Sequence, residues 1–170
     1  MAVKSVSGAV VVFHDVSESR ELNRRLSYHA SHDILTGLVN RREFENRLVR
    51  ALDELRDTPE GSHALLYIDL DHFKQVNDTY GHATGDGVLQ RVAEVLRSSV
   101  RQADWVGRWG GEEFVILLEN TSRHTAQQIA ERIRQRIAAD PIRVAGQSLQ
   151  LTISQGLAVR RDGDDDHTLL

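Results

Sequence analysis

Two glutamates, Glu112 and Glu113, follow a pair of glycines and precede an apolar run typical of a strand. Asp69 stands in a comparable place, near the end of the apolar run over 63–70. Where carboxylates meet, each charge raises the pKa of the next, and a divalent cation is the usual remedy. Oxygen ligands without histidine or thiolate favour Mg²⁺ or Mn²⁺, which commonly accompany nucleotide phosphates. Taken alone, a Gly-Gly-acid stretch is more often a solvated hairpin turn, because glycine supplies the positive φ that such turns need.

A second stretch, residues 69–86, suggests how a nucleotide would be held. The first turn of a helix after Asp69 would present free N–H groups to phosphate, and Lys74 adds a positive charge within reach. Asn77 and Asp86, on successive helices that can face one cleft, offer the amide and carboxylate that would pair with N1, N2 and O6 of guanine. Taken singly, Asn77 is better explained as a polar residue at a helix end, and Asp86 as an N-terminal charge that the helix dipole favours.

Hydrophobic periodicity predicts the elements that must position these residues. Residues 40–57 form an amphipathic helix with Asn40 as its cap. The expected elements that follow are a strand over 63–70, helices over 71–81 and 84–100, strands over 105–109 and 113–119, a helix over 122–140 and a strand over 148–159. This βααββαβ order predicts an α+β fold: a palm-like, ferredoxin-like sheet with an antiparallel core and helices packed around it. The first and third strands are then antiparallel neighbours, so Asp69 is expected to approach Glu112.

Composition excludes several classes of protein. The 170 residues carry a formal net charge of −4, which provides no basic field for gripping nucleic acid. The chain has no cysteine, which excludes disulfides and thiolate metal sites and fits a cytoplasmic location. No apolar run approaches the roughly 18 residues that a membrane span needs. This is compatible with a parent protein that has membrane segments elsewhere.

Four spaced motifs carry a resemblance to a known family: "HDILTGLVNRREF", "DLDHFKQVNDTYGHATGD", "RQADWVGRWGGEEF" and "LTISQGLA". In order and spacing they resemble the GGDEF family of diguanylate cyclases, in its GGEEF form, from about Tyr28 to Ala158. The resemblance implies an enzyme that joins two GTP molecules into cyclic di-GMP and releases two pyrophosphates. It also implies an antiparallel homodimer in which each protomer holds one GTP.

The resemblance assigns roles in catalysis. By this likeness Asp69, the carbonyl of Leu70 and Glu112 would hold the Mg²⁺ or Mn²⁺ ions, and Glu112 would also be the base for the ribose 3′-hydroxyl. Lys74 would stabilise the phosphates, and Glu113 would be a further acidic member of the catalytic set. In-line attack on the α-phosphate needs neutralised charge and positioning more than covalent help, which agrees with these roles.

The resemblance also assigns binding sites. Asn77, His82 and Asp86 would contact the nucleotide, chiefly guanine, together with Lys74 at the phosphates. The "RQAD" stretch would form an inhibitory product site through Arg101 and Asp104, joined by Arg132, since arginine can bond phosphate bidentately and stack on guanine. Without the family context, Arg101 and Asp104 are better explained as an ordinary surface pair.

The division of the chain follows from the same comparison. Residues 1–16 resemble the terminal strand of a PAS domain, 17–31 are expected to form a connecting helix, and 32–170 form a GGDEF domain that lacks the family's last C-terminal helix. A linked PAS domain, and an EAL domain in the parent protein, are the expected covalent partners. The alternative function is a catalytically inactive module that binds GTP or cyclic di-GMP and regulates a larger GGDEF-EAL protein.

Overall fold

The structure is a computed structural model that describes residues 26–56 and 61–161. The chain divides into two compact units, Met1–Ala30 and Ser31–Leu170. The strand expected over 1–16, the first part of the helix expected over 17–31 and the acidic end of the chain lie outside the described residues. Residues 26–31 are helical. Within the described ranges, no helix is long and apolar enough to cross a bilayer.

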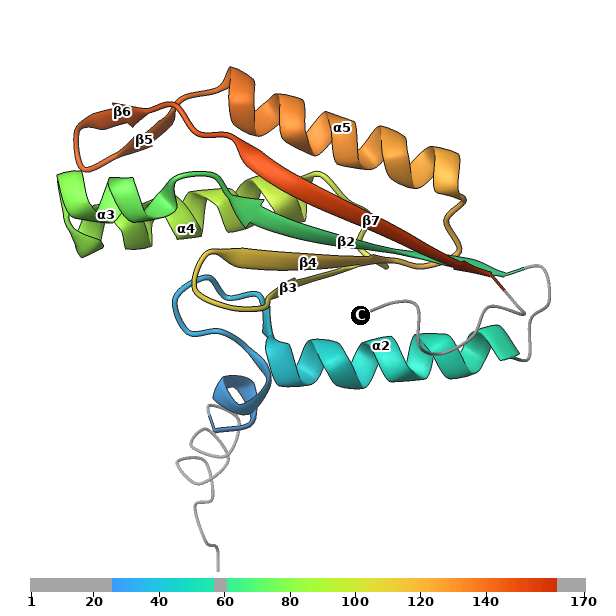
Figure 1. Cartoon of the computed structure of the whole chain (residues 1–170). Helices are drawn as coiled ribbons and strands as arrows, with labels where there is room; N and C mark the ends of the chain where they lie inside the picture. Colours follow the sequence, from blue (N-terminus) through green and yellow to red (C-terminus); the bar gives the residue numbers. More distant parts are fainter. Residues whose placement is uncertain (1–25, 57–60, 162–170) are drawn as a thin grey trace, which may run out of the picture. The chain divides into compact units, whose positions relative to one another are not determined.

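The second unit is built on one mixed sheet of five strands (Figure 1). In sheet order the strands are β1 (Val39–Asn40), β3 (Trp105–Arg108), β4 (Glu113–Leu118), β2 (Ser62–Leu70) and β7 (Ile153–Arg161). β2 pairs antiparallel with both β4 and β7, and β3 pairs antiparallel with β4. The predicted ferredoxin-like core is therefore confirmed. β1, which is parallel to β3, was missed because two residues carry no periodic signal.

Within the described ranges, four helices cover the two faces of this sheet (Figure 1). They are α2 (Arg41–Arg56), α3 (Phe73–Tyr80), α4 (His82–Ser98) and α5 (Arg123–Ala139). Along β4 the buried side chains alternate between two cores, as the pleat of a strand requires. Phe114 and Ile116 belong to the core under α3, α4 and α5, whereas Val115 belongs to a smaller core with Phe44 of α2. β4, which begins at the second glutamate, therefore contributes buried side chains to the cores on both faces of the sheet.

The start of α2 is confirmed in detail. The side chain of Asn40 accepts a hydrogen bond from the backbone N–H of Glu43 at 3.0 Å, which satisfies one of the unpaired donors of the first turn. Phe44 is fully buried and Leu48 nearly so, as the predicted apolar stripe requires. The first turns of α2 are in this way fixed against the sheet.

The final predicted strand, 148–159, is wrong at its beginning. Its first residues belong to a separate hairpin of β5 (Ile142–Val144) and β6 (Gln147–Leu149), and β7 starts only at Ile153. The hairpin turn consists of Ala145 at φ 49° and Gly146 at φ 79°. Alanine is uncommon in that left-handed region, so this turn carries no clear sequence signal.

Candidate active site

The register of β2 and β4 brings the three predicted acidic residues to one end of the sheet. Asp69 lies opposite Glu113 in the antiparallel ladder, and the N–H of Leu70 donates to the carbonyl of Glu112 at 3.3 Å. Asp69, Glu112 and Glu113 are here called the acidic edge. The predicted approach of Asp69 to the glutamate pair is confirmed, and it follows from strand pairing alone.

The charges of the acidic edge are poorly compensated. Burial, followed by the charges of Glu113 and Asp71, raises the pKa of Asp69. Burial, followed by the charges of Asp69 and Glu113, raises the pKa of Glu112. Neither Asp69 nor Glu112 has a side-chain hydrogen bond or ion pair with any residue in 26–56 or 61–161. A site of this kind favours a cation from outside the chain.

The donor set fits a hard divalent ion only when a further ligand completes it. Over the ranges that the structure describes, no three acidic or histidine side chains gather closely enough to hold an ion by themselves. The expected set is smaller: the carboxylates of Asp69 and Glu112 and the carbonyl of Leu70. Mg²⁺ is commonly bound by one or two carboxylates together with substrate phosphates, so these residues fit an ion that arrives with a nucleotide.

Asp71, two residues after Asp69, has a different environment. Its carboxylate accepts hydrogen bonds from Thr152 Oγ1 at 2.6 Å and Ser154 Oγ at 2.7 Å, which lower its pKa. Its backbone N–H donates to the carbonyl of Thr152 at 3.0 Å. Asp71 therefore connects the loop between β2 and α3 to the start of β7. Sequence analysis did not single it out, although the alternating acids of "DLD" were a usable signal.

A second residue missed by sequence analysis, Arg108, braces the glycine turn. Its guanidinium donates to the carbonyls of Gly110 at 3.1 Å and Gly111 at 2.7 Å. Nη1 also donates to both carboxylate oxygens of Asp33, at 3.1 and 3.2 Å. Burial alone would raise the pKa of Asp33, but hydrogen bonds from Thr36 and Arg108 outweigh it and lower the pKa. The turn that precedes β1 is thus connected to the turn that carries the glutamates.

The predicted nucleotide-contact residues lie on two adjacent helices. Asn77 of α3 is half-buried, and its side chain lies so close to Gly85 of α4 that a Cβ at residue 85 would overlap it. Lys74, His82 and Asp86 are exposed. Neither α3 nor α4 has a side-chain cap at its N-terminus, so the first-turn N–H groups have no such competing acceptor. Among the described residues, no hydrogen bond or ion pair joins these four side chains to one another.

The three residues of the predicted inhibitory site gather around the last residues of α4 and the loop after it, residues 97–104, which we call the arginine loop. Arg101 Nη2 lies 3.1 Å from Asp104 Oδ1, and the backbone N–H of Arg101 donates to Asp104 Oδ2 at 2.9 Å. The Asp104 side chain is 0% exposed, whereas that of Arg101 is 60% exposed. Arg132, on α5, donates to the carbonyl of Ser99 at 2.7 Å. The Arg101–Asp104 pair that was expected at the surface is present, but its carboxylate is buried.

Comparison with known proteins places the chain. Residues 30–170 match the family model described as "Diguanylate cyclase, GGDEF domain". The chain belongs to the GGDEF-domain family. The GGDEF domain described here is similar to the probable diguanylate cyclase DgcE of Escherichia coli K12, at 48% identity over 126 residues, 74% of this chain and 11% of that protein. It is also similar to diguanylate cyclase DgcM of the same strain, at 42% identity over 151 residues, 86% of this chain and 35% of that protein.

A solved structure supports the fold of the GGDEF domain. The coiled coil and GGDEF domain of DgcB from Caulobacter crescentus, in complex with c-di-GMP, matches with a TM-score of 0.80 at 30% identity, over 88% of this chain and 80% of that one. The chain spans less than half the length of DgcE and of DgcM. The α+β fold predicted from the order of elements is confirmed by this comparison.

Proposed function

We propose that this GGDEF domain is a diguanylate cyclase, which condenses two GTP into cyclic di-GMP and two pyrophosphates. The observation that carries the proposal is the acidic edge: Asp69 opposite Glu113 and beside Glu112, with burial and mutual repulsion raising the pKa of Asp69 and Glu112. Such a site is electrostatically incomplete until a cation and a phosphate chain occupy it together. Membership of the family, shown over residues 30–170, supports the same reaction.

The proposed roles follow the arrangement of these side chains. Asp69, the Leu70 carbonyl and Glu112 would hold Mg²⁺ or Mn²⁺, which when bound neutralises phosphate charge during attack at the α-phosphate. Glu112 would take the proton of the ribose 3′-hydroxyl. The first-turn N–H groups of α3 and Lys74 would bind phosphate oxygens.

Guanine selection is assigned to the two helices beside the acidic edge. Asn77 and Asp86 would pair with the edge of guanine, and His82 would add a further contact at the start of α4. Gly85 supports this role, because the side chain of Asn77 occupies the space that any larger residue would fill. Adenine would present the wrong donors to this pair.

The proposal also includes a catalytic homodimer and inhibition by the product. Catalysis would need a homodimer, because each protomer would supply one GTP. Product would bind at Arg101, Asp104 and Arg132 and inhibit turnover, which the gathering of these residues around the arginine loop supports. A supply of GTP is consistent with a cytoplasmic setting.

The test is direct conversion. The purified chain and the full-length gene product, incubated with GTP and Mg²⁺, should yield one cyclic di-GMP per two pyrophosphates, measured by chromatography and a pyrophosphate assay. A matched Glu112→Gln protein should yield neither. Light scattering on the same samples checks for the dimer.

The alternative is a non-catalytic module that binds GTP or cyclic di-GMP for an attached domain. Its signature would be tight binding of either nucleotide with no product from either protein at any metal concentration. That result would overturn the cyclase proposal and favour the module. Product formation that depends on Glu112 would exclude it.

A further inference from the structure

One side chain of the acidic edge is held by a residue that no part of the proposed mechanism uses. The hydroxyl of Tyr67 donates to Glu113 Oε1 at 2.6 Å. Hydrogen bonds from a hydroxyl to a carboxylate at about 2.5–2.7 Å are among the stronger ones, because the acceptor is charged. Tyr67 lies two residues before Asp69 on β2, so both side chains project from the same face of the sheet.

The other oxygen of Glu113 is confined as well. Glu113 Oε2 lies so close to Gly110 that a Cβ at residue 110 would overlap it. The backbone carbonyl of Glu113 accepts hydrogen bonds from the N–H groups of Trp109, at 2.9 Å, and Gly110, at 3.4 Å. The carboxylate therefore lies between the glycine turn on one side and the Tyr67 hydroxyl on the other. Gly110 is needed here for close approach, since any side chain would displace Glu113.

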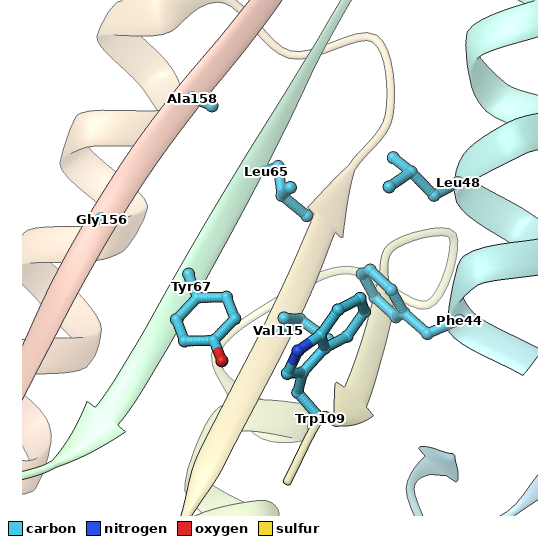
Figure 2. Close-up of a pocket in the computed structure, with 8 residues that line it drawn as sticks. All are labelled: Phe44, Leu48, Leu65, Tyr67, Trp109, Val115, Gly156 and Ala158. Carbon is cyan, nitrogen blue, oxygen red and sulfur yellow. The ribbon is translucent and has the colours of Figure 1, made fainter. Parts of the chain in front are cut away.

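Tyr67 is itself oriented by packing. Its ring meets that of Trp109 edge to face, with centroids 6.2 Å apart, and Trp109 in turn meets Phe44 at 6.3 Å. Figure 2 shows the Tyr67 ring on β2 and the Trp109 ring beside it, near Phe44 of α2, along an apolar pocket of about 380 Å³. The guanidinium of Arg41 stacks over the Trp109 ring at 4.5 Å. These contacts fix the direction of the phenol.

We propose that Tyr67 is a positioning residue of the metal and nucleotide site: its hydroxyl holds Glu113 turned along the sheet, as a fixed outer charge beside Asp69 and Glu112. Glu113 then supplies negative charge without competing to be a ligand, and the inner set is left to Asp69, Glu112 and the Leu70 carbonyl. Removing the hydroxyl would release Glu113 from this place, so its negative charge would no longer be held beside the ion site. Outer groups that orient the ligands of a metal typically change its affinity by about 10- to 100-fold. The inference rests on the proposed function.

The experiment compares Tyr67→Phe with wild type in Mn²⁺ binding. Free Mn²⁺ is measured by its paramagnetic resonance signal in the presence of a saturating non-hydrolysable GTP analogue, so that the readout does not depend on turnover. We expect Tyr67→Phe to weaken Mn²⁺ binding about tenfold. The metal concentration for half-maximal turnover should rise in parallel, with a smaller change in KM for GTP at saturating metal. Tyr80→Phe is the matched control, since it removes an exposed phenol from α3 and not the one on β2 that donates to Glu113.

A second pair of variants separates positioning from a loss of fold. Glu113→Asp keeps the charge but shortens the side chain, so it cannot reach Tyr67 and should weaken Mn²⁺ binding to a similar extent. The double variant Tyr67→Phe/Glu113→Asp should be no weaker than either single variant, because both remove one hydrogen bond. Equal Mn²⁺ binding by wild type and Tyr67→Phe, or additive losses in the double variant, would overturn the inference alone. Failure of the wild-type protein to bind Mn²⁺ with the analogue would overturn the proposed function, and the inference with it.

Discussion

At the acidic edge three carboxylates repel one another, whereas in the arginine loop the charged groups are already bonded within the chain. Asp69 and Glu112 have raised pKa values and no ion pair within the described ranges. In the loop, Arg97 Nη1 donates to the carbonyl of Asp104 at 2.7 Å, and Arg101 pairs with the buried Asp104 carboxylate. The acidic edge is therefore completed by addition of a ligand, while in the arginine loop a ligand would compete with contacts that the guanidinium groups already make.

The largest expected effect is at the acidic edge. Glu112→Gln should lower turnover at least about 100-fold, because it removes a metal ligand and the proposed base. The free energy of unfolding should stay the same or rise slightly, because one repulsive charge is removed. Initial rates with GTP and Mg²⁺, and urea unfolding, measure the two quantities. Glu94→Gln, on the exposed side of α4, is the control. Normal rates in Glu112→Gln would refute the metal assignment.

In the arginine loop, unlike at the acidic edge, removing a charge should destabilise the folded protein. Asp104→Asn should lower the free energy of unfolding by about 2–3 kcal/mol, because the fully buried carboxylate accepts from both the backbone and the guanidinium of Arg101. The expected value lies at or below the low end of the range for buried ion pairs, since Arg101 is largely solvated. Urea unfolding beside the exposed control Asp78→Asn tests it. A change no larger than that of the control would show that the loop is not held by Asp104.

The connection between the two turns should have an intermediate effect that depends on pH. Asp33→Asn should cost about 1–2 kcal/mol at pH 7, through its bonds to Thr36 and Arg108. The folded pKa of Asp33 lies below the ordinary aspartate value of 3.8, so the contribution is complete above that value. It is lost as pH falls through the folded pKa. Urea unfolding from pH 7 to about pH 3 should show the wild type and the variant converging at the acid end; a constant difference would contradict the assignment.

Sequence reasoning succeeded where one pattern and one topological rule were sufficient. The apolar run that includes Asp69, the paired glutamates and the antiparallel pairing of first and third strands together predicted the acidic edge. Asn40 was recognised as a cap because the capping bond is local, three residues away. In both cases the deciding interactions are either backbone ladders or contacts within one turn.

The contacts that were missed join side chains far apart along the chain. Tyr67 and Glu113 are 46 residues apart, and Arg108 and Asp33 are 75 apart. A hydrophobic pattern predicts which face of a strand is buried. It does not predict which polar group of a neighbouring element a side chain on that strand will contact. The hairpin at Ala145 was missed for another reason, since its backbone conformation is held by tertiary context against the preference of alanine.

The smallest expected loss of stability is at Arg132, and this variant separates a ligand site from a structural one. Its side chain makes one hydrogen bond of 2.7 Å, to the Ser99 carbonyl, from an exposed helix face, so Arg132→Ala should cost less than about 1 kcal/mol of unfolding free energy. If the arginine loop takes cyclic di-GMP by exchanging such contacts, the product concentration for half-maximal inhibition should nevertheless rise roughly tenfold, the worth of one charge-assisted bond to phosphate. Arg134→Ala, two residues away on α5 and paired with Glu131 at 2.8 Å, is the matched control for charge and exposure. Equal inhibition of the Arg132 and Arg134 variants would mean that the loop contacts serve the fold alone. A rise confined to Arg132→Ala would show that a bond of little value to the folded domain is exchanged for one to the product.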